Sequence, residues 1–150
     1  MTVKILMVCL GNICRSPLAE GILQSKLDPE RFQVDSCGTS SYHIGEKPDR
    51  RSIEIAKKYD IDITNQRAAQ FKISDFDTYD FIYPMDNSNY NNIIQLSRNE
   101  TDKQKVKLIL DELQPNAGLD VPDPYYGGEQ GFEDVFKMLQ SACDTIARKL

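Results

Sequence analysis

The sequence predicts a single-domain α/β fold over residues 1–150, built on a four-stranded parallel sheet with helices on both faces. The apolar run Val3–Val8 has the composition of a buried strand, and a short loop and a helix follow it. A second short strand comes after that helix, which completes a strand–helix–strand unit of the right-handed parallel type. A length of 150 residues suits one domain with one sizeable core.

The first helix is expected from Ser16 to about Leu27. Pro17 suits its first position, where the missing N–H costs no hydrogen bond. Leucine, isoleucine and alanine recur there at spacings of three and four, which is the pattern of an amphipathic helix. Asp28-Pro29 ends the helix, because a residue that precedes proline avoids helical backbone angles.

The middle of the chain continues the alternation of strands and helices. Strands are expected at Phe32–Ser36 and Tyr79–Tyr83, and apolar spacing predicts helices at Pro48–Tyr59 and Asn87–Leu96. The small and polar stretch 37–45 is expected to be a loop at the carboxyl edge of the sheet, where ligands bind in parallel folds.

The last third is less regular. Val106–Ile109 is the candidate for the fourth strand, although residues 103–113 also fit a helix by pattern. Residues 118–128 show no periodicity and include two prolines, which indicates a functional loop. From about Gly131 a long apolar stripe predicts the final helix, in which Cys143 is a core residue.

The composition is that of a soluble globular protein, with 40% hydrophobic and 27% charged residues. The net charge is −5 and basic runs do not exceed a pair, so we expect no nucleic-acid partner. The N-terminal apolar run stops at Gly11, too short for a membrane span, so we expect no membrane partner. Four cysteines and one histidine show no zinc spacing, so we expect no metal and no cofactor. A reducing cytoplasm is the expected location of the protein. Export by a route that needs no signal peptide stays an open alternative.

The loop between the first strand and the first helix combines an anion site with a nucleophile. Cys9 ends the strand, and Arg15 follows after five intervening residues. A loop that enters a helix N-terminus aims backbone N–H groups at one point, where an anion is held. A thiol that faces those groups and a guanidinium is expected to ionise and attack as a thiolate. The planar fork of Arg15 suits a phosphate.

The other loop residues fit the same phosphate-binding role. Gly11 lets the backbone turn tightly, and Asn12 tolerates a left-handed conformation. Ser16 can donate its hydroxyl hydrogen to the thiolate. The candidate phosphate-binding residues are Leu10, Gly11, Asn12, Ile13, Cys14 and Ser16.

Phosphate transfer to Cys9 requires a general acid, because the departing alkoxide or phenoxide leaves poorly unless protonated. Asp111, Asp120 and Asp123 are the candidates, and Asp123 is favoured because prolines on both sides stiffen its backbone. Two steps are then expected: attack on phosphorus to give a phosphocysteine, and hydrolysis by a water that Asp123 activates as a base. Arg15 holds the equatorial oxygens in both steps.

The stretch Val8-Cys9-Leu10-Gly11-Asn12-Ile13-Cys14-Arg15-Ser16-Pro17, with Asp-Pro-Tyr-Tyr at 123–126, resembles the low-molecular-weight protein tyrosine phosphatases. The resemblance extends to 35–36, 45–49 and 85–89, and so covers nearly the whole chain. It implies phosphotyrosine-containing proteins as substrates and inorganic phosphate as product. We also expect a monomer or a weak dimer.

Tyrosines are the candidates for the walls of the site. Tyr42, Tyr125 and Tyr126 could make a slot deep enough for phosphotyrosine and too deep for phosphoserine. The resemblance favours Tyr42 and Tyr125, which match aromatic positions that line the family's cleft. His43, in the loop beside them, is a further candidate for a substrate contact.

The resemblance also assigns supporting roles. It implies that Ser36 joins Asn12 in a hydrogen-bond network that shapes the loop, and that Cys14 forms a reversible disulfide with the nucleophile. Gln66 and Ala69 depart from the family, which often has His and Arg at these positions.

Related activities and other classes of protein fit these residues less well than a tyrosine phosphatase does. Protein arginine phosphatases typically carry Thr at the position of Ile13, and arsenate reductases of this fold need two further cysteines as a relay. Cys37 and Cys143 lack the paired spacing of such a relay. A phosphocarrier would have no use for Asp123, and a phosphotyrosine-binding module would have no use for a thiolate.

Overall fold

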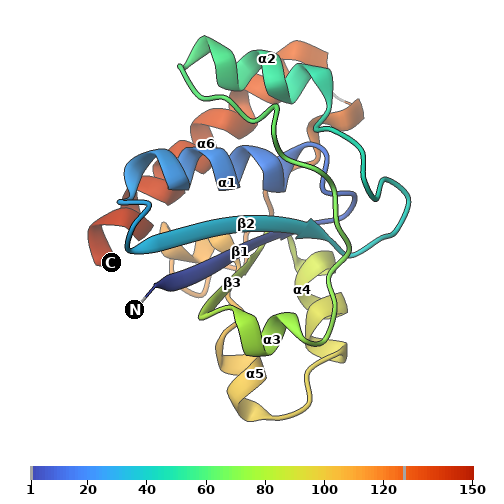
Figure 1. Ribbon diagram of the computed structural model, residues 1–150, viewed down its shortest axis with the longest axis vertical. Coiled ribbons are helices and arrows are strands. Elements are labelled where there is room, and N and C mark those ends of the chain that lie inside the picture. The colour runs from blue at the N-terminus through green and yellow to red at the C-terminus, as the bar shows by residue number, and fades with distance from the viewer. Residues whose placement is uncertain (1, 127) are drawn as a thin grey trace.

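The computed structural model describes residues 2–126 and 128–150, apart from the side chain of Tyr126. A parallel sheet forms its centre, with the strand order β2–β1–β3 (Figure 1). The three strands are β1 (Val3–Cys9), β2 (Phe32–Gly38) and β3 (Phe81–Pro84). Because all three run in the same direction, their carboxyl ends gather at one edge, and Cys9 ends the central strand there.

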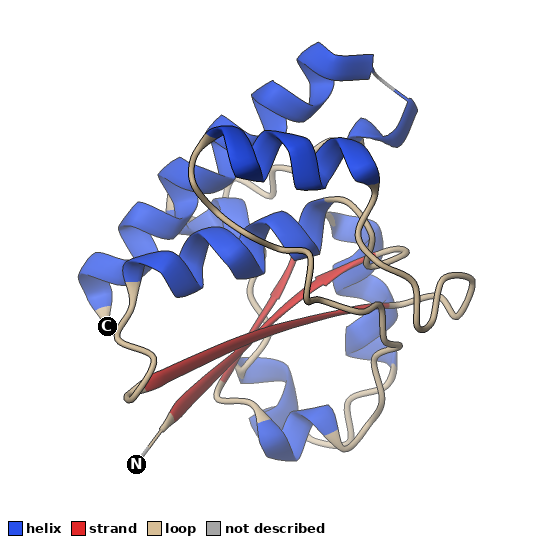
Figure 2. Cartoon of the chain, turned by 45° about the horizontal axis from the view of Figure 1, so that its top comes forward, coloured by secondary structure: helices blue, strands red, loops and turns tan. Residues whose placement is uncertain are grey.

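Helices cover both faces of the sheet, as expected (Figure 2). The side chains of β1 alternate, so that Ile5 and Met7 join one hydrophobic cluster and Leu6 and Val8 join the other. The first cluster lies under α1 (Arg15–Lys26), α2 (Arg50–Lys58) and α6 (Gly128–Lys149). The second lies against α3 (Asp75–Thr78) and α4 (Asn87–Gln95), beyond which the chain forms α5 (Glu100–Gln104).

The expectation of a fourth strand at Val106–Ile109 was wrong for the described chain, whose sheet has three strands. Val106 makes an isolated parallel bridge with Ile82, and the chain then turns into the 3-10 helix η1 (Ile109–Glu112). The bridge at Val106 does not extend into a longer ladder, because the chain enters η1 at Ile109. A short buried apolar run does not separate these two structures by sequence pattern.

Element boundaries differ from the expected ones by a few residues. α1 begins at Arg15, α6 begins at Gly128, and β3 is displaced toward the C-terminus and ends at Pro84. α2 begins at Arg50 because Asp49 is its N-cap, where its carboxylate accepts a hydrogen bond from the backbone N–H of Arg51.

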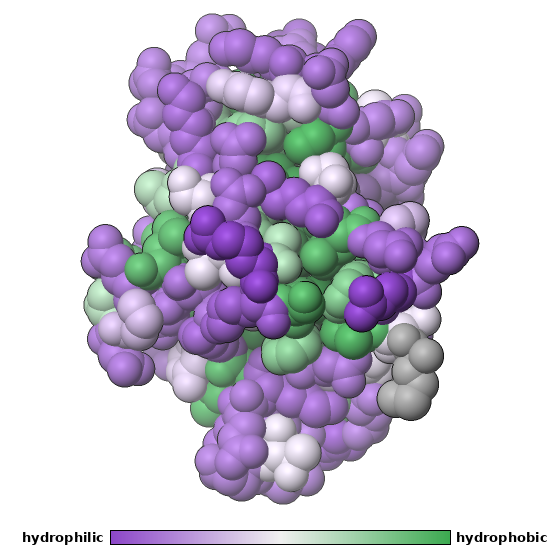
Figure 3. Space-filling model, turned by 90° about the vertical axis from the view of Figure 1, so that its left-hand side faces the viewer, coloured by the Kyte–Doolittle hydropathy of each residue, from purple (hydrophilic) through white to green (hydrophobic). Residues whose placement is uncertain are grey.

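The amino end of the sheet faces away from Cys9, on the side where both chain termini lie (Figure 1). Hydrophilic residues predominate on that face, with hydrophobic areas between them (Figure 3). Within the described residues, none of the helices has the length and apolar character that a membrane span requires.

Candidate active site

The cysteine loop, residues 9–15, carries the candidate nucleophile at its start. Cys9 is only 3% exposed. Its Sγ lies 3.0 Å from Oγ of Ser16, and the backbone N–H of Asn12 donates to it at 3.3 Å. The sulfur thus lies within hydrogen-bond distance of a hydroxyl group and of a backbone N–H at the N-terminus of α1.

Asn12 holds the cysteine loop in shape. Its φ of 57° is in the left-handed region, which asparagine tolerates better than most residues. Its Nδ2 donates to Oγ of Ser16 at 2.8 Å and to Oγ of Ser36 at 2.9 Å. Its Oδ1 accepts from the backbone N–H of Ala69 at 3.0 Å. The expected contact between Asn12 and Ser36 is therefore present.

Glu20 extends this network beneath the loop, a role that sequence reasoning did not assign to it. Ser36 donates its hydroxyl hydrogen to Oε1 of Glu20 at 2.7 Å. Burial raises the pKa of Glu20 to about 7, with the charge of Asp35 adding to the effect and the hydrogen bond from Ser36 opposing it. A carboxyl group that titrates near neutrality thus lies two hydrogen bonds from Asn12.

The segment that departs from the family pattern supports the loop through its backbone. Ala69 contributes its N–H to Asn12, and its carbonyl accepts from the N–H of Gly38 at 2.8 Å. Neither contact needs an arginine side chain at position 69. Nε2 of Gln66 donates to the carbonyl of Pro17 at 3.0 Å, and its buried Oε1 finds no hydrogen-bond partner among the described atoms.

Two glycines allow close packing around the loop. A Cβ on Gly38 would lie 2.6 Å from the carbonyl oxygen of Leu10, closer than real Cβ contacts come. A Cβ on Gly11 would press against the ring of His43 at 3.0 Å. Gly38, at the end of β2, was not singled out from the sequence, because its role depends on a neighbour distant in the chain.

Arg15 is buried, with 3% of its side chain exposed, and its guanidinium is fixed on one side. Nη1 donates to Oδ2 of Asp86 at 2.7 Å and to the carbonyl of Val121 at 2.9 Å. Burial by itself would lower the pKa of Arg15, but the facing Cys9 sulfur and the Asp86 carboxylate raise it above its ordinary range. The guanidinium therefore remains charged although it is buried.

Asp86 is the most important residue that sequence reasoning did not assign. Besides pairing with Arg15, it is the N-cap of α4, where Oδ1 accepts from the backbone N–H of Asn89 at 2.7 Å. A capping aspartate directly after a strand at the carboxyl edge was the available signal. The choice among several such aspartates required the fold.

The structure separates the three candidate general acids. Asp123 lies at the pocket, with Oδ2 3.8 Å from Nη2 of Arg15. Oδ1 of Asp120 instead accepts hydrogen bonds from the backbone and side chain of Asn87, at 2.8 and 2.7 Å. Asp111 accepts from the backbone N–H of Gly118 at 3.2 Å, and neither Asp111 nor Asp120 lines the pocket.

A pocket of about 290 Å³ opens at this edge of the sheet. It is lined by Cys9, Leu10, Gly11, Ile13, Cys14, Arg15, Ser40, Tyr42, His43, Asp123 and Tyr125. Asn12 and Ser16 are not part of the lining; both are buried, and their side chains are hydrogen-bonded to each other.

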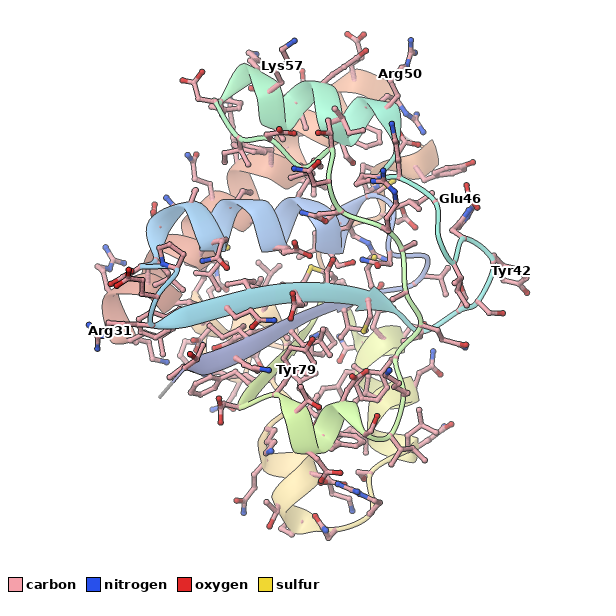
Figure 4. The ribbon with its side chains drawn as sticks, in the orientation of Figure 1. Arg31, Tyr42, Glu46, Arg50, Lys57 and Tyr79 are labelled. Carbon is pink, nitrogen blue, oxygen red and sulfur yellow. The ribbon has the colours of Figure 1, made fainter. Side chains whose placement is uncertain are left out.

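Aromatic side chains form the outer part of the pocket. Tyr42 is 84% exposed and points outward from its loop (Figure 4), and Tyr125 is 41% exposed on the opposite segment. Nδ1 of His43 lies 2.9 Å from Oε2 of Glu46, which orients the ring beside Gly11. The side chain of Tyr126, the third candidate wall, lies outside the described residues.

All four cysteines are free and buried. Burial, together with the negative charges of Asp49, Cys9 and Asp123, raises the pKa of Cys14 to about 12, so its thiol is protonated. Burial also raises the pKa of Cys143 to about 12 and that of Cys37 well above its ordinary value. These two thiols are therefore core residues and poor nucleophiles.

Comparisons with known proteins agree with this geometry. The family model described as low molecular weight phosphotyrosine protein phosphatase matches residues 4–150. The phosphatase of that name from Schizosaccharomyces pombe is 40% identical over 142 residues, which cover 91% of this chain and 90% of the relative. The human phosphatase of the same name is 37% identical over 153 residues, with coverages of 99% and 96%.

A solved structure is also similar over nearly its whole length. The crystal structure of a protein tyrosine phosphatase from Entamoeba histolytica, with Hepes in the active site, superimposes with a TM-score of 0.91. It is 38% identical in sequence, and the match covers 99% of this chain and 96% of the other.

Proposed function

This chain belongs to the low molecular weight phosphotyrosine protein phosphatase family and is a phosphatase of that type, and we propose that it acts through a phosphocysteine on Cys9. The observation that carries the proposal is that Cys9, Arg15 and Asp123 line one pocket. A nucleophile, a phosphate-binding cation and a proton donor thus converge on a volume that a phosphorylated side chain can enter.

In the first step the Cys9 thiolate attacks phosphorus and forms a sulfur–phosphorus bond. The bond from phosphorus to the tyrosine oxygen breaks, and the carboxyl proton of Asp123 passes to that oxygen. Backbone N–H groups of the cysteine loop and the guanidinium of Arg15 hold the non-bridging oxygens, where negative charge is spread in the transition state. Because Asp86 and Val121 already fix Arg15, its orientation changes little when phosphate arrives.

In the second step water attacks the phosphocysteine. Asp123, now a carboxylate, accepts a proton from that water, the sulfur–phosphorus bond breaks, and inorganic phosphate leaves. Ser16, 3.0 Å from the sulfur, donates to the departing thiolate. The chain thereby returns to its starting state without a cofactor.

The pocket walls support phosphotyrosine as the substrate side chain. Tyr42 and Tyr125 line the same pocket as Cys9, so an aromatic ring whose phosphate reaches Cys9 would meet aromatic walls. Ile13 contributes an apolar surface to the lining, which suits an aromatic ring. The arsenate reductase alternative is disfavoured, because Cys37 and Cys143 are buried core thiols.

Side-by-side turnover of a phosphotyrosine peptide, phosphoarginine and arsenate tests the proposal. We expect hydrolysis of phosphotyrosine that survives a chelator and is lost in Cys9→Ser. Preferential hydrolysis of phosphoarginine, or arsenate reduction with a thiol reductant, would replace the proposed substrate. Turnover retained in Cys9→Ser would overturn the mechanism. A cytoplasmic location and a monomeric or weakly dimeric state remain predictions.

A further inference from the structure

The acid loop, residues 120–125, is anchored on both sides of Asp123. On the upstream side the carbonyl of Val121 accepts a hydrogen bond from Nη1 of Arg15 at 2.9 Å. On the downstream side the carbonyl of Tyr125 accepts one from Nη2 of Arg51 at 3.0 Å. Asp123 lies midway, so these two arginines together limit how far its carboxyl group can move.

Arg51 is itself held on several sides. Its Nε and Nη2 form a fork on the carboxylate of Asp49, at 3.1 and 3.2 Å. Its guanidinium carbon lies 4.6 Å from the ring centre of Phe132 and 5.4 Å from that of Tyr125. A planar cation can make forked hydrogen bonds and stack on rings at once, which an ammonium group cannot. Arg51 therefore joins α2 to the acid loop and to the start of α6.

The same end of α2 also contacts the cysteine loop. The backbone N–H of Asp49 donates to the carbonyl of Ile13 at 2.7 Å, and Oγ of Ser52 donates to the carbonyl of Cys14 at 3.4 Å. The segment that carries Cys9 and the segment that carries Asp123 are thus both attached to the first residues of α2. This attachment is a second link between the two segments, beside the hydrogen bond from Arg15 to the carbonyl of Val121.

We propose that Arg51 is a positioning residue for Asp123: through the carbonyl and ring of Tyr125 it holds the carboxyl group above Cys9, where the leaving oxygen must receive its proton. The inference rests on the proposed role of Asp123 as general acid. Arg51 is not part of the pocket lining and acts on the reaction through the acid loop.

Arg51→Gln tests the proposal when aryl phosphates with good and with poor leaving groups are compared. A poor leaving group depends on protonation, whereas a good one departs with little help. Misplacement of a reacting group by about 1 Å can cost up to about 100-fold in rate. We therefore expect kcat/KM to fall by about 10- to 100-fold for poor leaving groups, and very little for good ones.

A double-mutant cycle with Asp123→Asn distinguishes this role from a general structural one. If Arg51 acts through Asp123, Arg51→Gln lowers the rate in the wild type and has little further effect in the Asp123→Asn background. Inhibition by inorganic phosphate, which reports the cysteine loop, should be unchanged. Arg51→Lys keeps the positive charge but not the forked hydrogen bonds, so its loss in kcat/KM for poor leaving groups should be intermediate. This variant replaces Arg51→Gln in the test if the Gln variant folds poorly.

Arg50→Gln is the matched control. Arg50 neighbours Arg51 on α2, but its side chain is 84% exposed, projects outward (Figure 4) and lies 3.8 Å from Glu54. We expect wild-type rates for this variant with all substrates.

Two results would overturn the role of Arg51: unchanged rates in Arg51→Gln, or an equal loss for all leaving groups and in both backgrounds. The general-acid assignment is judged separately by the single variant Asp123→Asn. If that variant retains wild-type rates with poor leaving groups, the proposed mechanism fails, and the role of Arg51 fails with it.

Discussion

Arg15, which lines the pocket, forms an ion pair with Asp86, with Nη1 of the arginine 2.7 Å from Oδ2 of the aspartate. The arginine side chain is 3% exposed and that of the aspartate 19% exposed. The aspartate is the carboxylate that lies closest to the buried guanidinium, and it fixes the plane of that group. Phosphate affinity and stability should therefore both depend on Asp86.

We expect Asp86→Ala to cost about 3 kcal/mol of stability, because the buried guanidinium of Arg15 loses its closest carboxylate and keeps only that of Asp123, 3.8 Å away. KM for phosphotyrosine should rise as Arg15 loses its orientation. Asp86→Asn is the matched control, since asparagine also caps helices and can still accept a hydrogen bond from Arg15. Urea unfolding and steady-state kinetics check both variants. Equal stability and KM in Asp86→Ala and the wild type would contradict this role.

Gly38→Ala should displace the cysteine loop, because its Cβ would lie 2.6 Å from the carbonyl oxygen of Leu10. We expect a loss of about 1–3 kcal/mol in stability from overpacking, together with a marked fall in kcat/KM.

Gly131→Ala is the control for the Gly38 variant. Gly131 lies within helix α6, and a Cβ at this position would lie 3.8 Å from Pro124, which is an ordinary contact distance. Alanine should stabilise that helix by about 0.5–1 kcal/mol. Thermal unfolding and kinetics of the two variants provide the comparison. A fully active Gly38→Ala enzyme would show that the loop can move away at no cost.

Glu20 should make the protein less stable as pH rises toward neutrality. Its pKa is raised from 4.5 to about 7 in the folded protein, chiefly by burial. Between these values the unfolded chain has released the proton while the folded chain retains it, so stability falls with increasing pH. The stability that the protonated Glu20 contributes is fully present below about pH 4.5 and is lost as the pH rises to about 7.

Denaturant unfolding of the wild type and Glu20→Gln at pH 5 and pH 8 measures this effect. Glutamine does not ionise and can still accept the hydrogen bond from Ser36. The free energy of unfolding of the wild type should therefore fall by about 1–3 kcal/mol between the two pH values because of Glu20, and that of Glu20→Gln should not show this fall. Identical pH dependence in the two proteins would contradict the assignment of the titration to Glu20.

Cys14→Ser should leave catalysis nearly intact and change recovery from oxidation. Peroxide oxidises the Cys9 thiolate to a sulfenic acid. The Cys14 thiol, which burial keeps protonated, must then give up its proton to the departing hydroxyl group as its sulfur attacks; water leaves, and a disulfide forms that a thiol reductant reverses. Without Cys14 the sulfenic acid proceeds to the irreversible sulfinic acid. Activity regained after peroxide and then dithiothreitol measures the difference. Full recovery in Cys14→Ser would argue against a protective disulfide.

The sequence was most informative where function depends on residues close together in the chain. Cys9, Asn12, Arg15 and Ser16 lie close together in the chain, from the end of β1 to the first turn of α1, so their convergence followed from local structure. Asp123 was selected by its flanking prolines and by resemblance, and the fold places it at the same pocket.

Residues that act across the fold were not predictable in the same way. Asp86, Gly38 and Arg51 contact the two loops from separate elements, and no local pattern specifies which aspartate, glycine or arginine meets them. The missing fourth strand has a different cause. The apolar run 108–110 is buried on all sides, and burial without alternation fits a helical turn as well as a strand.

The covalent intermediate provides the most direct test of the mechanism. A phosphotyrosine peptide is mixed rapidly with the enzyme, the reaction is quenched in acid, and digested fragments are analysed by mass spectrometry. We expect one phosphate on the fragment that contains Cys9, formed before steady state and absent in Cys9→Ser. Phosphate found on another residue, or turnover with no covalent intermediate at any time point, would contradict nucleophilic attack by Cys9.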